Sequence, residues 1–205
     1  MRRVVLASGN AGKLLEMRAL LADCGFEVLP QAEFGIEPPH EDGASFIENA
    51  LIKARHAARA SGLPAIADDS GLAVDALGGR PGIHSARFAG DDCSNEDNIA
   101  KLLHELAGVP AAQRSARFHC AMVFVRDADD PAPVVREGRW EGCIGFERRG
   151  AGGFGYDPLF LVAGDTRTVA EMPAVEKNRV SHRAQALNAL VSALSHLDDE
   201  SFPRV

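Results

Sequence analysis

The 205-residue sequence lacks any apolar run that approaches the ~20 residues needed to cross a membrane. It also lacks an excess of basic charge, because 22 lysines and arginines face 29 acidic residues and the formal net charge is −7. Such a surface repels a nucleic-acid backbone, so we expect neither a membrane nor a nucleic acid as partner. A small anionic substrate stays compatible with this composition, because a few local cations can outweigh a distant negative field.

Cysteines are few, and none belongs to a CxxC pair: they are Cys24, Cys93, Cys120 and Cys143. The spacing argues against a structural zinc site, and a chain of this length does not need disulfides to supplement its core. The first eight residues carry two arginines and then only four apolar residues, which is too short for a signal peptide. We therefore predict free thiols and a cytoplasmic location.

Strand-like and helix-like patterns are interspersed along the chain. Strands are predicted over 4–7, 64–67 and 118–125, with a returning hairpin strand over 134–144. Helices are predicted over 13–22, 45–60, from Ser94 onward, and over 183–197. The hairpin makes the sheet mixed rather than purely parallel. Without a repeat or a clean linker, we predict one α/β domain over residues 1–205, in which any two lobes share the sheet.

The first candidate site is the strand–turn–helix junction Ser8-Gly9-Asn10-Ala11-Gly12-Lys13. Small residues let the backbone approach an anion, the helix N-terminus presents N–H groups, and Lys13 adds a full charge. It is not a P-loop, because Ala7 stands where that motif needs glycine and Leu14 where it needs Ser or Thr. The pattern predicts a phosphate site, and a plain glycine turn with a surface lysine is the alternative.

The second candidate is Asp68-Asp69-Ser70-Gly71, which we expect at the end of a strand. Neighbouring side chains of a strand point to opposite faces, so one carboxylate can enter a ligand site at the end of the sheet. A hard divalent cation prefers such oxygen ligands. An ordinary acidic turn uses the same residues.

Glu41 and Glu48 are candidate partners of Asp69 on that metal. Glu48 has the spacing of a capping box with Ser45, whereas Glu41 has no local partner, so we prefer Glu41 as the ligand. Lys53 lies on the same helix face as Asn49 and is a candidate phosphate contact. A solvated helix face is the simpler interpretation of Lys53.

A glycine-rich loop over 150–157 contains Phe154, Gly155, Tyr156 and Asp157. Glycine neighbours let Phe154 lie flat against a planar ligand, and stacking of a base on an aromatic ring contributes roughly 1–3 kcal/mol. For Tyr156, a place in the core is the alternative.

Lys177 and the pair His182 and Arg183 form the last candidate group. His182 and Arg183 follow Ser181, the expected N-cap of the last helix, where the helix dipole disfavours positive charge. This placement suggests a bound acceptor or anion, and an exposed basic turn is the alternative.

The order and spacing of these motifs are more specific than any one of them. The segments SGNAGK, ENALIKA, ADDSGL, PGIHSARF, GFGYDPLF and SHRAQAL together closely resemble the inosine/xanthosine triphosphate pyrophosphatase family, over residues 4 to about 195. This resemblance implies an elongated α/β fold with a central mixed sheet flanked by helices, and two lobes with the active-site cleft between them. It also implies a homodimer that uses Mg²⁺ to convert the purine nucleoside triphosphates ITP, dITP and XTP to monophosphate and pyrophosphate.

The resemblance also assigns roles. Ser8, Gly9, Asn10, Ala11, Gly12 and Lys13 match the triphosphate site. Asp69 matches the proton acceptor and a metal ligand, and Glu41 the other metal position. Lys53 and Ser70 match substrate contacts. Phe154, Gly155, Tyr156, Asp157, Lys177, His182 and Arg183 match the base pocket. Ser8 stands where many relatives have Thr, and both residues keep a hydroxyl.

These assignments suggest a mechanism in which Mg²⁺ and the two lysines, Lys13 and Lys53, offset the charge of a triphosphate attacked by water at the α-phosphorus. Asp69 activates the water directly or through the metal, and both versions stay open. Donors from Lys177, His182 and Arg183 fit a 6-keto oxygen and leave the 6-amino group of ATP unmatched. The competing functions are a pyrophosphatase for other nucleotides and a nucleotide-binding protein without catalysis, while the failed P-loop at Ala7 and Leu14 disfavours a phosphotransferase or motor ATPase.

Overall fold

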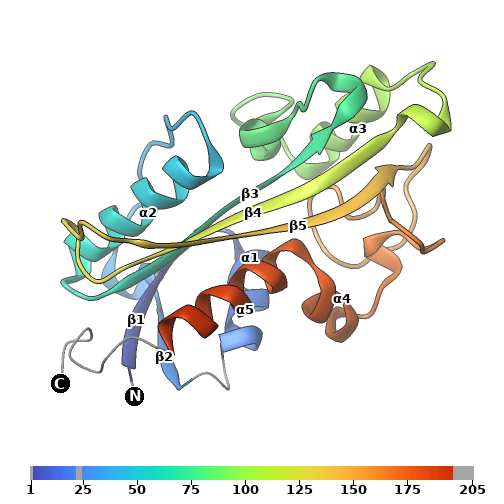
Figure 1. Ribbon diagram of the computed structural model, residues 1–205. Helices are drawn as coiled ribbons and strands as arrows, with labels where there is room; N and C mark the ends of the chain where they lie inside the picture. Colours follow the sequence, from blue (N-terminus) through green and yellow to red (C-terminus); the bar gives the residue numbers. More distant parts are fainter. Residues whose placement is uncertain (1, 22–24, 196–205) are drawn as a thin grey trace. The chain divides into compact units, whose positions relative to one another are not determined.

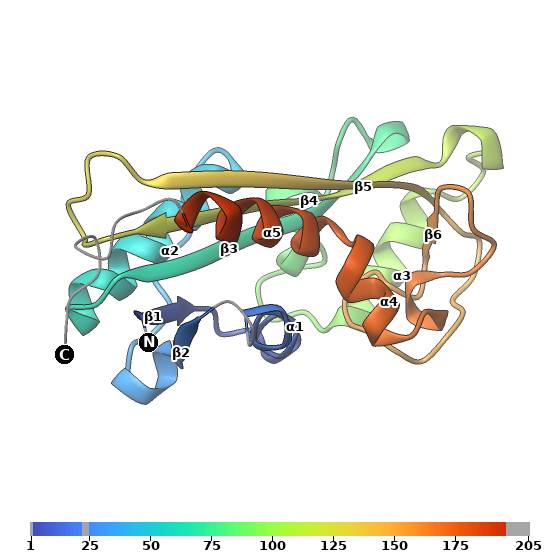
Figure 2. The same cartoon turned by 60° about the horizontal axis from the view of Figure 1, so that its bottom comes forward.

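The computed structural model describes residues 2–21 and 25–195. Within these residues, six strands form one sheet in the order β2-β1-β3-β4-β5-β6 (Figures 1 and 2). The strands are β1 (Arg2–Ala7), β2 (Phe26–Pro30), β3 (Ala65–Val74), β4 (Ser115–Val125), β5 (Val134–Ile144) and β6 (Phe160–Val162). Because β1 pairs in parallel with β2 and β3 while β5 and β6 are antiparallel, the predicted mixed sheet is confirmed.

The α-helices of the described residues are α1 (Ala11–Leu21), α2 (Phe46–Ser61), α3 (Asn95–Glu105), α4 (Ala174–Val180) and α5 (His182–Leu194). Short 3₁₀ turns lie at Gln31–Phe34, Asp75–Leu77, Gly82–Arg87, Ala111–Gln113 and Val169–Glu171. Side-chain caps fix where α2 and α3 begin: Ser45 accepts a hydrogen bond from the Glu48 N–H, and Ser94 forms a reciprocal capping box with Asp97. Among the described residues, no helix is both long and apolar enough to span a bilayer.

The acidic motif is the main correction to the predicted elements. The strand expected over 64–67 continues to Val74 as β3, so Asp68 and Asp69 lie inside a strand rather than in a turn after it. Both side chains are buried, and each is paired with cationic side chains, which makes two carboxylates tolerable within a sheet. The predicted hairpin strand over 134–144 is confirmed as β5.

The chain divides into two compact units. Unit 1 holds the described residues within 1–69, 120–138 and 183–205, and unit 2 holds 70–119 and 139–182. Three strands, β3, β4 and β5, run from one unit into the other. The boundary between the units falls after Asp69 in β3, after His119 in β4 and after Gly138 in β5.

Unit 1 packs helices on both faces of its part of the sheet (Figures 1 and 2). On one face, α2 places a row of alanines against small and β-branched residues of the sheet: Ala50, Ala54, Ala57 and Ala58 against Val5, Ala7, Ala65, Ala67, Val123 and Val125. On the other face, α1 and α5 cover the larger residues, with Met17, Leu21, Leu187, Leu190 and Leu194 against Val4, Leu6, Ile66, Met122 and Phe124. The predicted apolar stripe of the last helix is thus confirmed for its described residues, while Leu197 lies outside them.

Unit 2 has one core cluster that is richer in aromatic residues. It joins Leu72 and Val74 of β3 to Ile99 and Leu102 of α3 and to five aromatic rings, those of Phe88, Phe118, Trp140, Tyr156 and Phe160. Buried Arg114 ties the end of α3 to the β5 side of this unit, because it donates to the carbonyl oxygens of Leu106 and Gly145. The core therefore holds the loop around Tyr156 in a fixed place.

Candidate functional site

The amino-terminal turn between β1 and α1 is built by two side-chain hydrogen bonds. Asn10 caps α1, because its Oδ1 accepts from the Lys13 N–H at 3.0 Å, and Ser8 Oγ accepts from the Asn10 N–H at 3.3 Å. The turn is exposed from Gly9 to Ala11. A helix N-terminus with open backbone N–H groups beside a lysine is a favourable place for an anion.

Lys13 points from this turn to a buried carboxylate. Its Nζ lies 3.1 Å from Asp68 Oδ2, and Arg183 Nε lies 3.4 Å from the same oxygen. Arg183 also forms an ion pair with Glu16 of α1. Burial by itself would raise the pKa of Asp68, but Lys13, Arg183 and Lys53 together hold that pKa well below its ordinary value. Asp68 is therefore ionised in the fold.

A second ion cluster lies around Lys53, whose Nζ is 2.9 Å from Asp69 Oδ1 and 3.2 Å from Glu41 Oε2. Asn49, one helical turn earlier, donates to Asp69 Oδ2 at 3.3 Å. Burial lowers the pKa of Lys53, but the charges of Asp69, Asp68 and Glu41 raise it above its ordinary value overall. Lys53 is buried, so its interpretation as part of a solvated helix face is wrong. Asn49 and Lys53 both contact Asp69, which confirms that they share a helix face.

The alternation of β3 explains why the two clusters are separate. Asp68 points to the face that carries Ile66 and the α1 and α5 residues, and Asp69 points to the face that carries Ala65, Ala67 and α2. The consecutive carboxylates therefore serve different lysines.

Asp69 and Glu41 fit a divalent cation by the chemistry of their donors. Both carboxylates already converge on one positive charge, the ammonium of Lys53. Glu48 is engaged elsewhere, since its Oε2 accepts from the Ala44 N–H at 2.7 Å at the start of α2. Among the described residues no group of three or more metal-ligating side chains exists. Two carboxylates suit Mg²⁺, which usually keeps waters and binds substrate phosphates besides one or two carboxylates.

Unit 2 folds the glycine-rich loop around one carboxylate. Asp157 Oδ2 accepts from the Phe154 N–H at 2.9 Å and from Lys177 Nζ at 2.7 Å, and the Lys177 ammonium lies 4.8 Å from the centre of the Phe154 ring. A Cβ on Gly153 would lie 2.1 Å from Asp157 Oδ2, so the turn requires glycine there. This arrangement combines a half-buried flat ring with a lysine donor.

Tyr156 belongs to the core, as the alternative interpretation held. It is 5% exposed, and its hydroxyl donates to the Ser85 carbonyl oxygen at 2.9 Å. Ser70 lies in β3 within unit 2 and is half-buried.

His182 and Arg183 are neighbours in sequence but fall in different units. The imidazole of His182 stacks on Phe118, with ring centres 4.8 Å apart and planes at 11°. The guanidinium of Arg183 instead contacts Asp68 and Glu16. Successive residues at the start of a helix point about 100° apart, which allows this separation. The expected trio of donors is therefore divided, with Lys177 and His182 in unit 2 and Arg183 in unit 1.

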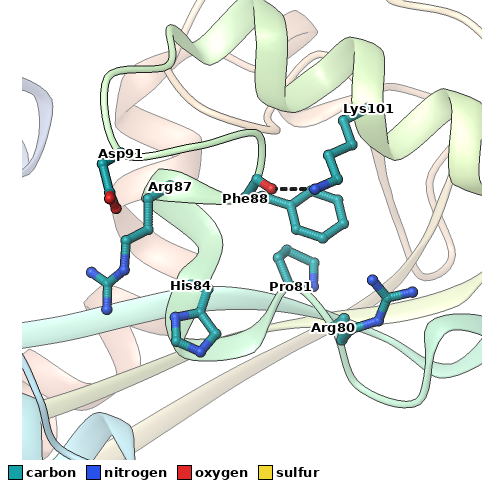
Figure 3. A pocket seen from close by; sticks show the side chains of 7 residues that line it. All are labelled: Arg80, Pro81, His84, Arg87, Phe88, Asp91 and Lys101. Carbon is teal, nitrogen blue, oxygen red and sulfur yellow. Dashed lines mark hydrogen bonds between the residues drawn. The ribbon is translucent and has the colours of Figure 1, made fainter.

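A further hollow in unit 2, of about 390 Å³, is lined by Arg80, Pro81, His84, Arg87, Phe88, Asp91 and Lys101 (Figure 3). Its cations do not converge as those around Asp68 do. Arg80 and Arg87 extend in opposite directions in Figure 3, and Arg80 pairs with Glu105. Lys101 Nζ donates to the Phe88 carbonyl oxygen at 2.6 Å and lies over the ring of Phe88. The hollow therefore fits a triphosphate less well than the lysines of unit 1.

Sequence reasoning gave no role to three residues of the site: Asp68, Glu16 and the side-chain amide of Asn49. The four-residue spacing of Asn49 and Lys53 was a usable signal for the amide. Nothing local marks Asp68, because its partners Lys13 and Arg183 lie 55 and 115 positions away in the chain.

An α/β fold with buried lysine–carboxylate clusters beside a helix N-terminus is typical of proteins that bind phosphorylated ligands. A family model described as "Ham1 family" matches residues 4–193, and the chain belongs to this family. The family resemblance predicted from the motifs is confirmed.

Relatives cover nearly all of the chain. A dITP/XTP pyrophosphatase of Methylococcus capsulatus is 61% identical over 96% of this chain and 98% of its own length, and one of Escherichia coli O157:H7 is 55% identical over 95% and 98%. A solved Ham1 protein of Coxiella burnetii has a TM-score of 0.88 at 47% identity, covering 96% of this chain and all of that one. The Ham1 protein of Staphylococcus aureus has a TM-score of 0.82 at 38% identity, covering 95% of this chain and 98% of that one.

Proposed function

We propose that this protein hydrolyses aberrant purine nucleoside triphosphates, ITP, dITP and XTP, to the nucleoside monophosphate and pyrophosphate. The observation that carries the proposal is the pair of lysine–aspartate clusters in unit 1, because a polyanion needs cations that are already held in place. The dITP/XTP pyrophosphatases that share 55–61% of their residues with this chain support the choice of reaction.

The residues of unit 1 take the phosphates. The α1 N-terminus with Ser8 to Lys13 binds phosphate oxygens through N–H groups and the Lys13 ammonium, and Lys53 adds a second charge. Asp69 and Glu41 would hold Mg²⁺, which would neutralise charge on the phosphates of the bound substrate. The Lys53 ammonium already contacts both carboxylates, and its positive charge offsets the repulsion between their negative charges.

Asp69 takes part in the chemical step. Water attacks the α-phosphorus, the bond from that phosphorus to the oxygen bridging to the β-phosphorus breaks, and pyrophosphate leaves. The proton lost by the water passes to a base, for which the Asp69 carboxylate is the candidate. Asn49 and Lys53 each hold one of its oxygens, so the orientation of this carboxylate is fixed before substrate arrives.

The residues of unit 2 take the base. The Phe154 ring offers a stacking face, and Lys177 and His182 offer N–H donors to a 6-keto oxygen. Adenine presents a 6-amino group instead, so donor would face donor, and this mismatch can cost a factor of about 10⁴ where the site is buried. Arg183 forms an ion pair with Asp68 in unit 1, so we do not count it among the donors to the base.

The direct test is to add ITP, dITP, XTP, GTP and ATP separately to the protein with Mg²⁺ and to measure pyrophosphate and orthophosphate. We expect pyrophosphate from ITP, dITP and XTP and little turnover of ATP, with activity lost on chelation of the metal. Comparable rates with ATP would contradict the donor argument and favour a pyrophosphatase for other nucleotides. Binding of ITP without any product would favour a non-catalytic nucleotide-binding protein.

The family resemblance also supports proposals for assembly and location: a homodimer, in the cytoplasm. The described cysteines Cys93, Cys120 and Cys143 are free thiols, which suits a reducing compartment. Light scattering of the purified protein, with a dimer mass expected, tests the first of these.

A further inference from the structure

The Asp68 side chain is fully buried, yet the proposed reaction gives this carboxylate no task. One of its oxygens, Oδ2, contacts Lys13 at 3.1 Å and Arg183 at 3.4 Å. The side chain of Arg183 is 2% exposed and that of Lys13 is 14% exposed, so the pairing extends from the interior toward the surface. Glu16 completes the arrangement by pairing with Arg183.

A purely stabilising role explains this cluster poorly. Buried ion pairs give little net stability, because the cost of removing charges from water offsets their attraction. The second oxygen of Asp68, Oδ1, is buried and no donor of the described residues reaches it, which adds a further cost. This energetic cost is understandable if the cluster fixes the position of Lys13, the member that reaches a ligand.

We infer that Asp68 is a positioning residue that holds the Lys13 ammonium beside the N-terminus of α1, and that Arg183 and Glu16 in turn hold Asp68. The inference rests on the proposed function, since it takes Lys13 as a contact of the triphosphate. Asp68 touches no substrate in this scheme and acts through Lys13.

The sign of one measurement separates this role from a simple charge effect. If Asp68 only contributes negative charge near the phosphates, its neutralisation strengthens binding of an anion. If Asp68 positions Lys13, its neutralisation weakens that binding, because the ammonium loses its fixed place. A displacement of about 1 Å at such a site can cost up to about 100-fold.

The experiment measures pyrophosphate binding to the full-length protein by calorimetry, together with KM and kcat for ITP. For Asp68→Asn we expect about tenfold weaker pyrophosphate binding and a KM that rises more than kcat falls. The matched control is Asp130→Asn, which neutralises another buried, ion-paired carboxylate of unit 1. Asp130→Asn is expected to lower stability and to leave the pyrophosphate Kd unchanged.

A double-mutant cycle tests whether the effect passes through Lys13. In the Lys13→Met background, Asp68→Asn should cause no further loss of pyrophosphate binding. An additive loss would mean that Asp68 acts by another route and would overturn the inference.

Two variants keep the test valid if Asp68→Asn does not fold. Arg183→Lys and Glu16→Gln retain the Asp68 charge but loosen its support, and we expect each to weaken pyrophosphate binding by about two- to fivefold, in the range of lost single contacts. Unchanged or tighter pyrophosphate binding in Asp68→Asn overturns the inference. Unchanged binding in both Arg183→Lys and Glu16→Gln does so as well, and so does a wild-type protein that binds no pyrophosphate. A wild type that binds pyrophosphate but forms none from ITP overturns the proposed function alone.

Discussion

The two units place the same types of charged residue in different surroundings. Unit 1 contains buried ion pairs, in which Lys13 and Arg183 contact Asp68 and Lys53 contacts Asp69. In unit 2, several arginine–carboxylate pairs lie on the surface, as between Arg117 and Asp75 or between Arg148 and Glu96. Exposed pairs contribute ~0–1 kcal/mol, whereas buried ones are costly to form and concentrate at functional sites. Burial of ion pairs, rather than their number, therefore marks candidate sites in this fold, and the pairs of unit 1 are the ones that we propose for the phosphates.

Unit 2 has its own buried pair, and it differs from those of unit 1 by its aromatic neighbour. Lys177 and Asp157 sit beside the Phe154 ring, and His182 stacks on Phe118. Flat rings with a few donors suit a planar base, and clustered lysines suit phosphates. The comparison predicts that variants in unit 1 change pyrophosphate chemistry and that variants in unit 2 change base recognition.

The largest effect is expected for Asp69→Asn. Removing a positioned general base costs about 10²–10⁴-fold, so kcat for ITP should fall by that factor while the ranking of ITP, XTP and ATP stays the same. Asp75→Asn is the matched control in unit 2, because Asp75 pairs with Arg117 at the surface. Steady-state pyrophosphate release measures both, and near-normal turnover in Asp69→Asn would remove Asp69 from the mechanism.

Phe154→Ala should give the next largest effect. Loss of a stacking face costs roughly 1–3 kcal/mol, which corresponds to about 5- to 150-fold in kcat/KM for ITP. Inhibition by pyrophosphate should stay unchanged, because that anion carries no base. Phe146→Ala, which removes a ring that is 64% exposed, serves as the control. A loss of pyrophosphate inhibition in Phe154→Ala would contradict the assignment of the phosphates to unit 1 and of the base to unit 2.

A pair of glycine variants sharpens the role of the Asp157 turn. Gly153 and Gly155 have φ angles of +72° and +58°, so alanine at either position costs about 1–2 kcal/mol of backbone strain. Only at Gly153 would the new Cβ also collide with Asp157 Oδ2, while at Gly155 nothing lies within 4 Å. We expect Gly153→Ala to raise KM for ITP and to lower the melting temperature more than Gly155→Ala does. Equal effects would show that the carboxylate does not set the loop conformation.

The smallest effect concerns a thiol of unit 1. Burial, with the neighbouring Asp68 charge, raises the pKa of Cys120 to about 12, so the reactive thiolate is scarce at pH 8 and stays scarce up to about pH 10. Cys93 and Cys143 of unit 2 are half-buried. Iodoacetamide at pH 8 followed by peptide mass spectrometry should label these two in the folded protein and spare Cys120, with activity little changed. Rapid labelling of Cys120 would contradict its burial beside Asp68.

Local patterns were enough for much of the fold. The hairpin strand over 134–144, the cap at Ser45 and the stripe Leu187, Leu190 and Leu194 follow from periodicities that neighbouring residues set. The length of β3 was missed, because Asp68, Asp69, Ser70 and Gly71 are turn-forming residues by composition. Their burial against distant cations overrides that preference.

The candidate site was predicted in the same uneven way. Lys13, Asp69 and Lys53 were predicted as site residues. In the structure Asp69 forms an ion pair with Lys53, whereas Lys13 forms one with Asp68. Arg183 was assigned to the base together with His182, and the structure pairs it with Asp68 and Glu16. The dimer, the cytoplasmic location, the Mg²⁺ requirement, and the engagement of both units by one nucleotide stay predictions.

By itself, the sequence determined the family, the mixed α/β sheet and the identity of the charged and aromatic residues, because motifs and periodicity are properties of neighbouring positions. The tertiary structure decided which carboxylate serves which lysine. Alternation along β3 sends Asp68 and Asp69 to opposite faces, and the helices packed on each face supply different cations. Such pairings join residues as far apart as Glu16 and Arg183, which are separated by 167 positions, and only the folded chain brings them within hydrogen-bonding distance.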